Sequence, residues 1–251
     1  MEQRLNARQA TIVERLRNRG EVKISELKQL FDVTEMTVRR DLEKLEQLGI
    51  AVRTFGGAIL DSRDIELAQR STVRSEEKER IGRRAAQSVR DGESVFIDGG
   101  STTFQIARHL PDRADVTVVT NALNIASELA AKKIQTIVVG GLLLEATISM
   151  VGPTAVESIS RMAFDKVFLG ATGLDANHGF SNSNLLEADV KRMAIQKAKE
   201  SIVVLDHSKF GEQVLVSFAA LQDVHRIVTD RLPDGELLEA CREAGMDVEL
   251  A

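Results

Sequence analysis

From residue 92 onward the chain alternates between short apolar runs and helical segments, and this alternation restricts the possible folds more than any other feature. The apolar runs cover residues 94–98, 116–120, 136–139, 166–169, 201–205, 226–229 and 247–250. Segments with helical periodicity lie between most of them, at residues 103–110, 123–131, 186–199 and 235–244. This order predicts an α/β domain with a mostly parallel sheet covered by helices. In open sheets of this type, ligands bind beyond the carboxyl ends of the strands.

The loop after the first apolar run has the composition of a phosphate-binding turn. Asp98 ends the run, and Gly99-Gly100-Ser101-Thr102-Thr103 leads directly into a helix. Glycines let the backbone approach a ligand closely, while the hydroxyls and the first helical N–H groups point at it. The loop is neither a Walker loop nor a G-x-G-x-x-G dinucleotide loop. We expect a phosphate-bearing ligand here; the alternative is an ordinary tight turn between strand and helix.

Other candidate ligand-binding residues lie at or near the ends of later strands. They are Thr120, Asn121, Gly140, Gly141, Gly152, Thr172 and Lys209. Glu187 and Lys191 are four residues apart, so they share one face of a helix. If that face looks into the site, Lys191 is a candidate to bind an anion or a carbonyl oxygen. The alternative is a surface ion pair worth roughly a few tenths of a kcal/mol.

In the N-terminal part, residues 35–48 have the pattern of a helix buried along one side. Val38, Leu42 and Leu45 recur at i, i+4 and i+7, which places them on one face. We expect Thr34 to cap this helix and Gly49 to end it. Residues away from the buried face, or at the start of the helix, are predicted to contact DNA bases or flanking phosphates. They are Thr34, Met36, Thr37, Arg39, Arg40 and Lys44.

Two helices are expected upstream of this one. The first covers residues 4–19 and ends at Gly20, and the second, capped by Ser25, covers residues 26–31. Two helices joined by a tight turn, the second with arginines at its start, fit a helix-turn-helix. An ordinary two-helix packing unit with a solvated basic face has the same periodicity. Asp41 lies beside the buried stripe, so we expect it to pair within the module.

A β-hairpin is predicted after these helices. Residues 50–52 and 58–60 are its strands, and Gly56 and Gly57 lie at its turn. Such a hairpin would form a wing beside the helix, from which Arg53 could reach a DNA phosphate. The helices and this hairpin together predict a winged helix-turn-helix.

The predicted domain boundaries follow from these patterns. Residues 1–60 form the winged module, the polar residues 61–75 form an irregular connection, and residues 76–251 form the sheet domain. The first 60 residues carry 11 Lys and Arg against 9 Asp and Glu, whereas the remainder has a net charge of −7. This polarity favours DNA binding by the N-terminal part only weakly. The charged side chains of a helix over residues 76–86 are expected to face solvent.

Several classes of protein are not expected. The sequence has no apolar run of about 18 residues and no signal-like start, so we expect a cytoplasmic protein without a membrane partner. Cys241 is the single cysteine, which excludes an intrachain disulfide. The four histidines are scattered without ligand spacing, so neither a metal site nor a cofactor is expected.

The N-terminal motif resembles that of the DeoR family of bacterial transcription regulators. Val33-Thr34-Glu35-Met36-Thr37-Val38-Arg39-Arg40-Asp41-Leu42 carries the resemblance, together with Leu45, Gly49 and Gly56-Gly57-Ala58. Arg70 with Glu77-Lys78 also matches the family spacing, and the likeness extends over residues 4–230. It implies a C-terminal sugar-phosphate sensor domain similar in fold to ribose-5-phosphate isomerase. It also implies a homodimer or homotetramer.

The resemblance makes an isomerase-like enzyme the alternative function. Such an enzyme needs a carboxylate as general base. Thr172 stands where the family usually has Asp, which removes one candidate base and leaves Glu187. We therefore expect no catalytic residues and no enzymatic activity.

The predicted function is a DNA-binding transcriptional regulator. The resemblance implies a repressor of a carbohydrate-catabolic operon that is released from operator DNA by a phosphorylated sugar or sugar acid. Within the family, residues 171–173, 178–182 and 206–211 are most similar to inositol-catabolism repressors. That similarity implies a phosphorylated keto sugar acid as effector.

Overall fold

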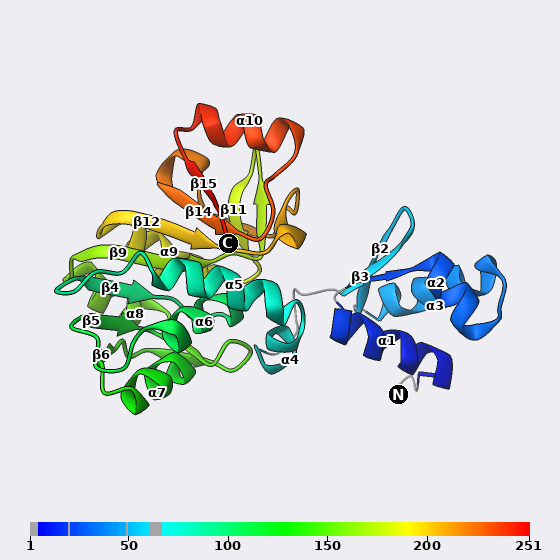
Figure 1. Cartoon of the computed structure of the whole chain (residues 1–251), viewed down its shortest axis with the longest axis horizontal. Helices are drawn as coiled ribbons and strands as arrows, with labels where there is room; N and C mark the ends of the chain where they lie inside the picture. The colour runs from blue at the N-terminus through cyan, green and yellow to red at the C-terminus, as the bar shows by residue number, and fades with distance from the viewer. Residues whose placement is uncertain (1–4, 20, 49, 61–66) are drawn as a thin grey trace. The chain divides into compact units, whose positions relative to one another are not determined.

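The computed structural model describes residues 5–19, 21–48, 50–60 and 67–251 (Figure 1). The chain divides into two compact units, residues 1–75 and 76–251. Gly20 and Gly49, the predicted ends of two helices, and residues 61–66 of the predicted connection lie outside the described residues.

In the N-terminal unit, three helices and a small antiparallel sheet surround one apolar core. The helices are α1 (Ala7–Arg19), α2 (Ile24–Phe31) and α3 (Glu35–Gln47), and the strands are β1 (Glu21–Lys23), β2 (Ala51–Thr54) and β3 (Gly57–Leu60), in the order β1-β3-β2. Val38, Leu42 and Leu45 are fully buried in this core, as their spacing predicts. The hairpin β2–β3 is the predicted wing.

Three local features of this unit differ from the sequence-based expectation. Helix α2 begins at Ile24, and Lys23 occupies its N-cap position without a side-chain cap, so Ser25 is not the cap. Strand β1, which pairs with β3, was not predicted because three residues carry too little alternation to be detected. Helix α4 (Leu67–Thr72) lies in the connection that was expected to be irregular.

The C-terminal unit is built on a seven-stranded sheet in which every neighbouring pair is parallel. Its strands are β4 (Ser94–Ile97), β5 (Thr117–Thr120), β6 (Gln135–Val138), β9 (Phe164–Gly170), β12 (Ala198–Val204), β14 (Arg226–Thr229) and β15 (Asp247–Leu250), in the order β15-β14-β12-β9-β4-β5-β6. Each predicted apolar run forms one of these strands, with small differences in length. The predicted α/β fold class is therefore confirmed.

Helices cover both faces of this sheet (Figure 1). They are α5 (Ser75–Ala86), α6 (Ser101–His109), α7 (Leu123–Ala131), α8 (Pro153–Ser160), α9 (Leu185–Gln196) and α10 (Gly235–Glu243). Val95 and Ile97 pack in one core cluster with α5, α6 and α7, whereas Phe96 packs in the other with α8 and α9. This division follows from the alternation of side chains along a strand. Lys78 of α5 is buried, so the charged helix is not wholly a solvated face.

Further short elements that were not predicted complete this unit. They are the hairpin β7 (Leu142–Leu144) with β8 (Ser149–Val151), the antiparallel sheet of β10 (Gly173–Asp175), β11 (Gly179–Asn182) and β13 (Val216–Ala219), and the 3-10 helices η1 (His207–Lys209) and η2 (Leu221–Asp223). Strand β11 leads through Asn184 into α9. The side chain of Asn184 accepts hydrogen bonds from the backbone N–H groups of Leu186 and Glu187, which fixes the start of this helix.

Candidate functional site

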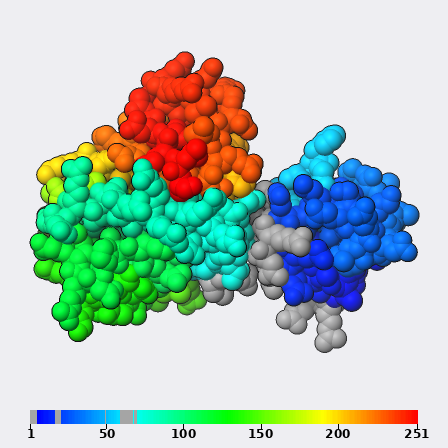
Figure 2. Space-filling model, in the orientation of Figure 1, coloured from blue at the N-terminus to red at the C-terminus, as the bar shows by residue number. Residues whose placement is uncertain are grey.

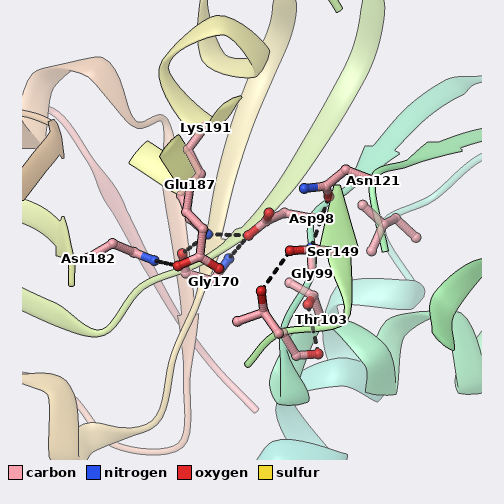
Figure 3. Close-up of polar contacts among 12 residues, drawn as sticks. Asp98, Gly99, Thr103, Asn121, Ser149, Gly170, Asn182, Glu187 and Lys191 are labelled. Atoms are coloured by element: carbon pink, nitrogen blue, oxygen red, sulfur yellow. Dashed lines mark hydrogen bonds and ion pairs between the residues drawn. The ribbon is translucent and has the colours of Figure 1, made fainter. Parts of the chain in front are cut away.

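Asp98 is the centre of a group of polar residues at the carboxyl end of the sheet (Figure 3). It follows β4, which lies between β5 and β9, and its backbone N–H donates to the carbonyl of Phe168 at 3.0 Å. Lys191 of α9 forms an ion pair with Asp98 and donates to the carbonyl of Gly170 at 2.8 Å. Only 1% of Lys191 and 3% of Asp98 are exposed. The face of α9 that carries Lys191 therefore looks into the site, and the alternative of a surface pair with Glu187 is wrong.

The environment of this ion pair is strongly desolvated. Burial raises the pKa of the Asp98 carboxyl, the ammonium of Lys191 opposes that shift, and the charge of Glu187 adds to it. The Lys191 ammonium also lies 5.5 Å from the centroid of the Phe218 ring, within the range of a cation–π contact. Protein groups therefore surround and neutralise the charge of Lys191.

Glu187 and Asn182 form a second buried pair beside the first. Asn182 is 6% exposed and donates from Nδ2 to Oε2 of Glu187 at 3.3 Å; Glu187 is 8% exposed. The Oδ1 atom of Asn182 is buried and has no hydrogen-bond partner among the described residues. Sequence reasoning missed Asn182 because strand β11, which positions it, was not predicted.

The predicted phosphate-binding loop lies on the other side of Asp98. Helix α6 begins at Ser101 with Gly100 as its N-cap, and no side chain caps it. The first N–H groups of a helix have no partner within the helix, so they are available to an anion. The hydroxyl of Thr103 donates to the carbonyl of Gly100 at 3.1 Å, which leaves Ser101 and Thr102 as the hydroxyl donors for a ligand.

Gly99 has a packing reason to be glycine. A Cβ atom built at Gly99 would lie 2.9 Å from Cβ of Ser149, a buried residue of β8 that sequence reasoning missed. The N–H of Gly99 donates to Oδ1 of Asn121 at 3.2 Å. The loop is thereby held against β8 and the end of β5.

Thr120 and Asn121 hold strand ends together in this structure. The Thr120 hydroxyl donates to the carbonyl of Ile97 at 2.6 Å, and Nδ2 of Asn121 donates to the carbonyl of Met150 at 3.0 Å. Both side chains are buried. They are therefore bound to protein atoms within the site.

The remaining candidate ligand-binding residues lie at the ends of other strands and at the start of α8. Gly140 and Gly141 are exposed, and a Cβ atom at Gly141 would lie 2.6 Å from the carbonyl oxygen of Val151. Gly152 precedes Pro153 at the start of α8 and has a φ of 89°. Two other candidates, Thr172 and Lys209, are half-buried: the N–H of Thr172 donates to the carbonyl of Ser181 at 3.0 Å, and η1 with Lys209 lies beside β10.

In the N-terminal unit, α3 presents an exposed polar face. Thr34 caps the helix as predicted, because its hydroxyl oxygen accepts from the N–H of Thr37 at 3.3 Å. Met36, Arg39 and Arg40 are exposed, whereas Thr37 and Lys44 are half-buried. Arg39 pairs with Glu35 one turn earlier at 2.7 Å, and Arg40 has no ion pair among the described residues.

Asp41 is structural, as expected. It is buried, its Oδ2 accepts from Nε of Arg8 at 2.5 Å, and its Oδ1 accepts from Nε2 of Gln9 at 3.0 Å. Asp41 therefore joins α3 to α1. The hydrogen bond from Arg8 also raises the pKa of that guanidinium.

The wing is tied to α3 through Arg53. Its backbone N–H donates to Oε1 of Glu46 at 3.1 Å and its Nε donates to Oε2 at 2.6 Å, and these bonds lower the pKa of Glu46. Arg53 thus pairs with a protein carboxylate in the DNA-free chain. The turn of the hairpin projects from the rest of the unit (Figure 2), and Phe55 at this turn is fully exposed.

The described residues contain no group of three or more His, Cys, Asp or Glu side chains that could hold a metal ion. Cys241 is buried, and this burial raises the pKa of its thiol. No helix in the described part of the chain is long and apolar enough to cross a membrane.

Comparison with known families identifies both units. A family model of the DeoR-like helix-turn-helix domain matches residues 8–64, and a model of the DeoR C terminal sensor domain matches residues 73–231. The chain belongs to the DeoR family. As a DeoR-family regulator it has a helix-turn-helix DNA-binding domain followed by a sensor domain, as the sequence motifs predict.

Curated relatives of this DeoR-family chain cover nearly its whole length. The uncharacterized HTH-type transcriptional regulator YulB of Bacillus subtilis (strain 168) is 36% identical, over 96% of this chain and 95% of the relative. The HTH-type transcriptional regulator IolR of the same strain is 35% identical, over 92% and 94%. The glycerol-3-phosphate regulon repressor of Escherichia coli (strain K12) is 31% identical, over 95% and 96%.

Solved structures show more distant likenesses. Ribose 5-phosphate isomerase A from Methanocaldococcus jannaschii has a TM-score of 0.41 and 16% identity over 54% of both chains. The sorbitol operon regulator SorC from Klebsiella pneumoniae has a TM-score of 0.38 and 12% identity over 82% of this chain and 90% of SorC. These likenesses are too distant to bear on function.

Proposed function

We propose that this DeoR-family regulator is a repressor of a carbohydrate-catabolic operon and that a phosphorylated sugar releases it from operator DNA. The observation that carries the proposal is the polar site at the carboxyl end of the parallel sheet. There, the uncapped start of α6 adjoins the buried pair Asp98 and Lys191. A phosphate suits the start of the helix, and hydroxyl or carbonyl groups suit the buried polar side chains.

On the DNA side, the exposed start of α3 would enter the major groove. Arg40 is the strongest candidate for a base contact because it is exposed and has no ion pair among the described residues. A bidentate Arg–guanine contact gives about 1–3 kcal/mol of discrimination. Arg39 and Arg53 would have to exchange Glu35 and Glu46 for a DNA phosphate.

On the effector side, the phosphate would bind the N–H groups and hydroxyls of Ser101 and Thr102. The sugar hydroxyls would then face Asn182, Glu187 and Lys191. The Escherichia coli relative is named for the glycerol-3-phosphate regulon, and this name agrees with a small phosphorylated effector.

Coupling between the effector site and the DNA-binding site requires an oligomer with more than one helix-turn-helix module. We propose that residues 1–60 bind DNA and that residues 76–251 bind the effector and form a homodimer or homotetramer. Paired helix-turn-helix modules read two half-sites, which a single small module cannot do. Coupling between effector and DNA is typically about 1–3 kcal/mol.

The alternative, a sugar-phosphate isomerase, has one supporting observation, the buried Glu187 carboxylate near Lys191 and Asp98. The relatives above are named as regulators, which favours the non-enzymatic proposal. Incubation with pentose and hexose phosphates distinguishes the two functions, because only an isomerase would interconvert them.

The deciding experiment is an anisotropy titration of the purified protein against DNA from upstream of its own gene and neighbouring operons, with and without a panel of sugar phosphates. We expect salt-dependent specific binding that one phosphorylated sugar abolishes. Thr102→Ala should need a higher concentration of that sugar to release the same DNA, whereas Thr136→Ala, in edge strand β6, should behave as wild type. Specific binding that responds to no member of the panel would overturn the effector proposal.

A further inference from the structure

Strand β6 is an edge strand of the parallel sheet, and its outer side is open. It pairs with β5 and with no other strand among the described residues (Figure 1). The N–H of Val139, directly after β6, donates to the carbonyl of Thr120 at 2.8 Å, so it points toward β5. Because successive backbone groups of a strand point to opposite sides, the N–H and C=O groups of Thr136 and Val138 point outward. These groups are in position to bind another strand.

The two edges of the sheet differ in charge. The opposite edge strand, β15, carries Asp247 and Glu249, and Glu249 forms ion pairs with Arg84 and Arg226. Charged side chains on an edge strand hinder its pairing with another chain. Residues 134–144, which include β6, have no charged side chain and no proline. Strand β6 therefore lacks the protection that β15 has.

Exposed apolar side chains lie on β6 and on the segments that adjoin it. These residues, here called the β6 surface, are each 38–64% exposed. They are Leu123, Ile137, Val138, Leu142, Leu143 and Ile148. The start of α7 adjoins the hairpin β7–β8, since the N–H of Leu123 donates to the carbonyl of Ile148 at 3.0 Å. Apolar side chains gathered in this way are typical of a protein–protein interface.

We infer that the β6 surface binds a second copy of this chain, with the two β6 strands antiparallel about a two-fold axis at Ile137. In this register, Thr136 and Val138 of one copy exchange backbone hydrogen bonds with Val138 and Thr136 of the other. The two Ile137 side chains lie directly opposite each other, as in a non-hydrogen-bonded antiparallel pair. This interface rests on the proposed oligomer of residues 76–251 and names the surface that forms it.

The occupant is a second copy because the edge is complementary to itself. The two residues with outward backbone groups lie symmetrically about Ile137, so a two-fold axis pairs the N–H and C=O groups of both. Residues 134–144 carry no charge that would repel the same segment of another copy. A two-fold axis also supplies the paired helix-turn-helix modules that two half-sites of an operator need.

Sedimentation equilibrium of the full-length protein tests the surface. Ile137→Asp places two carboxylates opposite each other at the axis, so the Kd of association should rise at least about a hundredfold. At micromolar concentration the molar mass should then fall to half of the wild-type value. Leu215→Asp is the matched control, because Leu215 is 80% exposed and lies outside the β6 surface. It should keep the wild-type mass. An unchanged mass in Ile137→Asp would overturn the inference.

A cysteine cross-link tests the register without depending on how Ile137→Asp folds. Non-hydrogen-bonded partners have Cα atoms about 4.5 Å apart, which lies within the range of roughly 4.4–6.8 Å for a disulfide. Oxidised Ile137→Cys should therefore form a covalent dimer. Gln135→Cys should not, because the two Gln135 residues would lie roughly 13 Å apart along the strands. The native Cys241 is buried, so the wild type should stay unlinked. Absence of a link in Ile137→Cys would overturn the register.

The outcomes distinguish this interface from the proposed function. An oligomer whose mass and operator binding are the same in wild type and Ile137→Asp would overturn the β6 interface and leave the regulator proposal intact. A wild-type protein that is monomeric at every concentration would overturn both the interface and the proposed oligomer. Cross-linking of Ile137→Cys in a protein that binds no operator DNA would support the interface and contradict the function alone.

Discussion

The exposed face of α3 and the buried polar site of the sensor domain both contain an ion pair. The pair on α3 is in solvent, whereas the pair in the sensor domain is buried. Arg39 and Glu35 pair in solvent, with about half of each side chain exposed. Lys191 and Asp98 pair in the interior, with almost no exposure. Exposed pairs contribute about 0–1 kcal/mol, whereas removal of one partner from a buried pair costs about 3–5 kcal/mol. Substitutions on the exposed face of α3 should therefore affect DNA binding without affecting stability, whereas substitutions of Lys191 or Asp98 should affect both ligand binding and stability.

Lys191→Met is expected to have the largest effect. It leaves Asp98 buried without its counter-ion, so the free energy of unfolding of the sensor domain should fall by about 3–5 kcal/mol. Urea denaturation followed by circular dichroism measures this loss. Asp98→Asn in the Lys191→Met background should recover much of the stability because the uncompensated charge is then absent. Lys199→Met, which removes an exposed partner of Asp165, should cause no comparable loss. Equal losses in Lys191→Met and Lys199→Met would contradict the comparison.

Asp41→Ala tests a buried carboxylate within the DNA-binding domain itself. The change leaves Arg8 and Gln9 without their acceptor, and we expect a loss of about 1.5–3 kcal/mol, as for other hydrogen bonds to charged groups. The melting temperature of the full-length protein, with helix content as the signal, would report it. The exposed Glu43→Ala on the same helix is the control and should change stability by less than about 0.5 kcal/mol. A neutral Asp41→Ala would mean that α1 and α3 do not depend on this contact.

Arg40→Ala should separate affinity from stability. Operator affinity is expected to fall by about 1–3 kcal/mol, while the free energy of unfolding changes by less than about 0.5 kcal/mol. Anisotropy titrations at two salt concentrations give the affinity, and the same denaturation experiment gives the stability. Arg161→Ala, at an exposed position after α8, removes an equal charge and should bind the operator as wild type does. Normal operator binding by Arg40→Ala would remove this residue from the DNA interface.

The smallest expected effect concerns the pH dependence of Asp165. Hydrogen bonds from the Lys199 ammonium, the Ser94 N–H and the Ser94 hydroxyl lower the pKa of this carboxyl below its ordinary value. A carboxyl with a lowered folded-state pKa stabilises the protein above its unfolded-state pKa, and this contribution is lost as the pH falls toward the folded-state value. Asp165→Asn should thus lower the melting temperature slightly at pH 7 and have less effect at pH 3. An equal change at both pH values would show that the charge of Asp165 contributes no stability.

Much of the fold and part of the site could be predicted from local sequence patterns. Each strand of the parallel sheet and the buried stripe of α3 were predicted because alternation and helical periodicity depend on neighbouring residues alone. The cap at Thr34 and the loop after β4 were recognisable for the same reason. The antiparallel sheet β10-β11-β13 was missed because its strands are short. In addition, β11 pairs with β13, which lies far from it in the sequence.

The sequence by itself determined the fold class, the helix that presents Arg40 and the turn that could hold a phosphate. Only the tertiary structure decided that Lys191 neutralises Asp98, because the two residues are 93 positions apart in the sequence. It also decided that Asn182 and Glu187 place hydrogen-bond acceptors beside this ion pair. The physical reason is burial. Periodicity shows which face of a helix is apolar, but the charge state and free partners of a polar side chain depend on contacts that form only when distant strands and helices pack together.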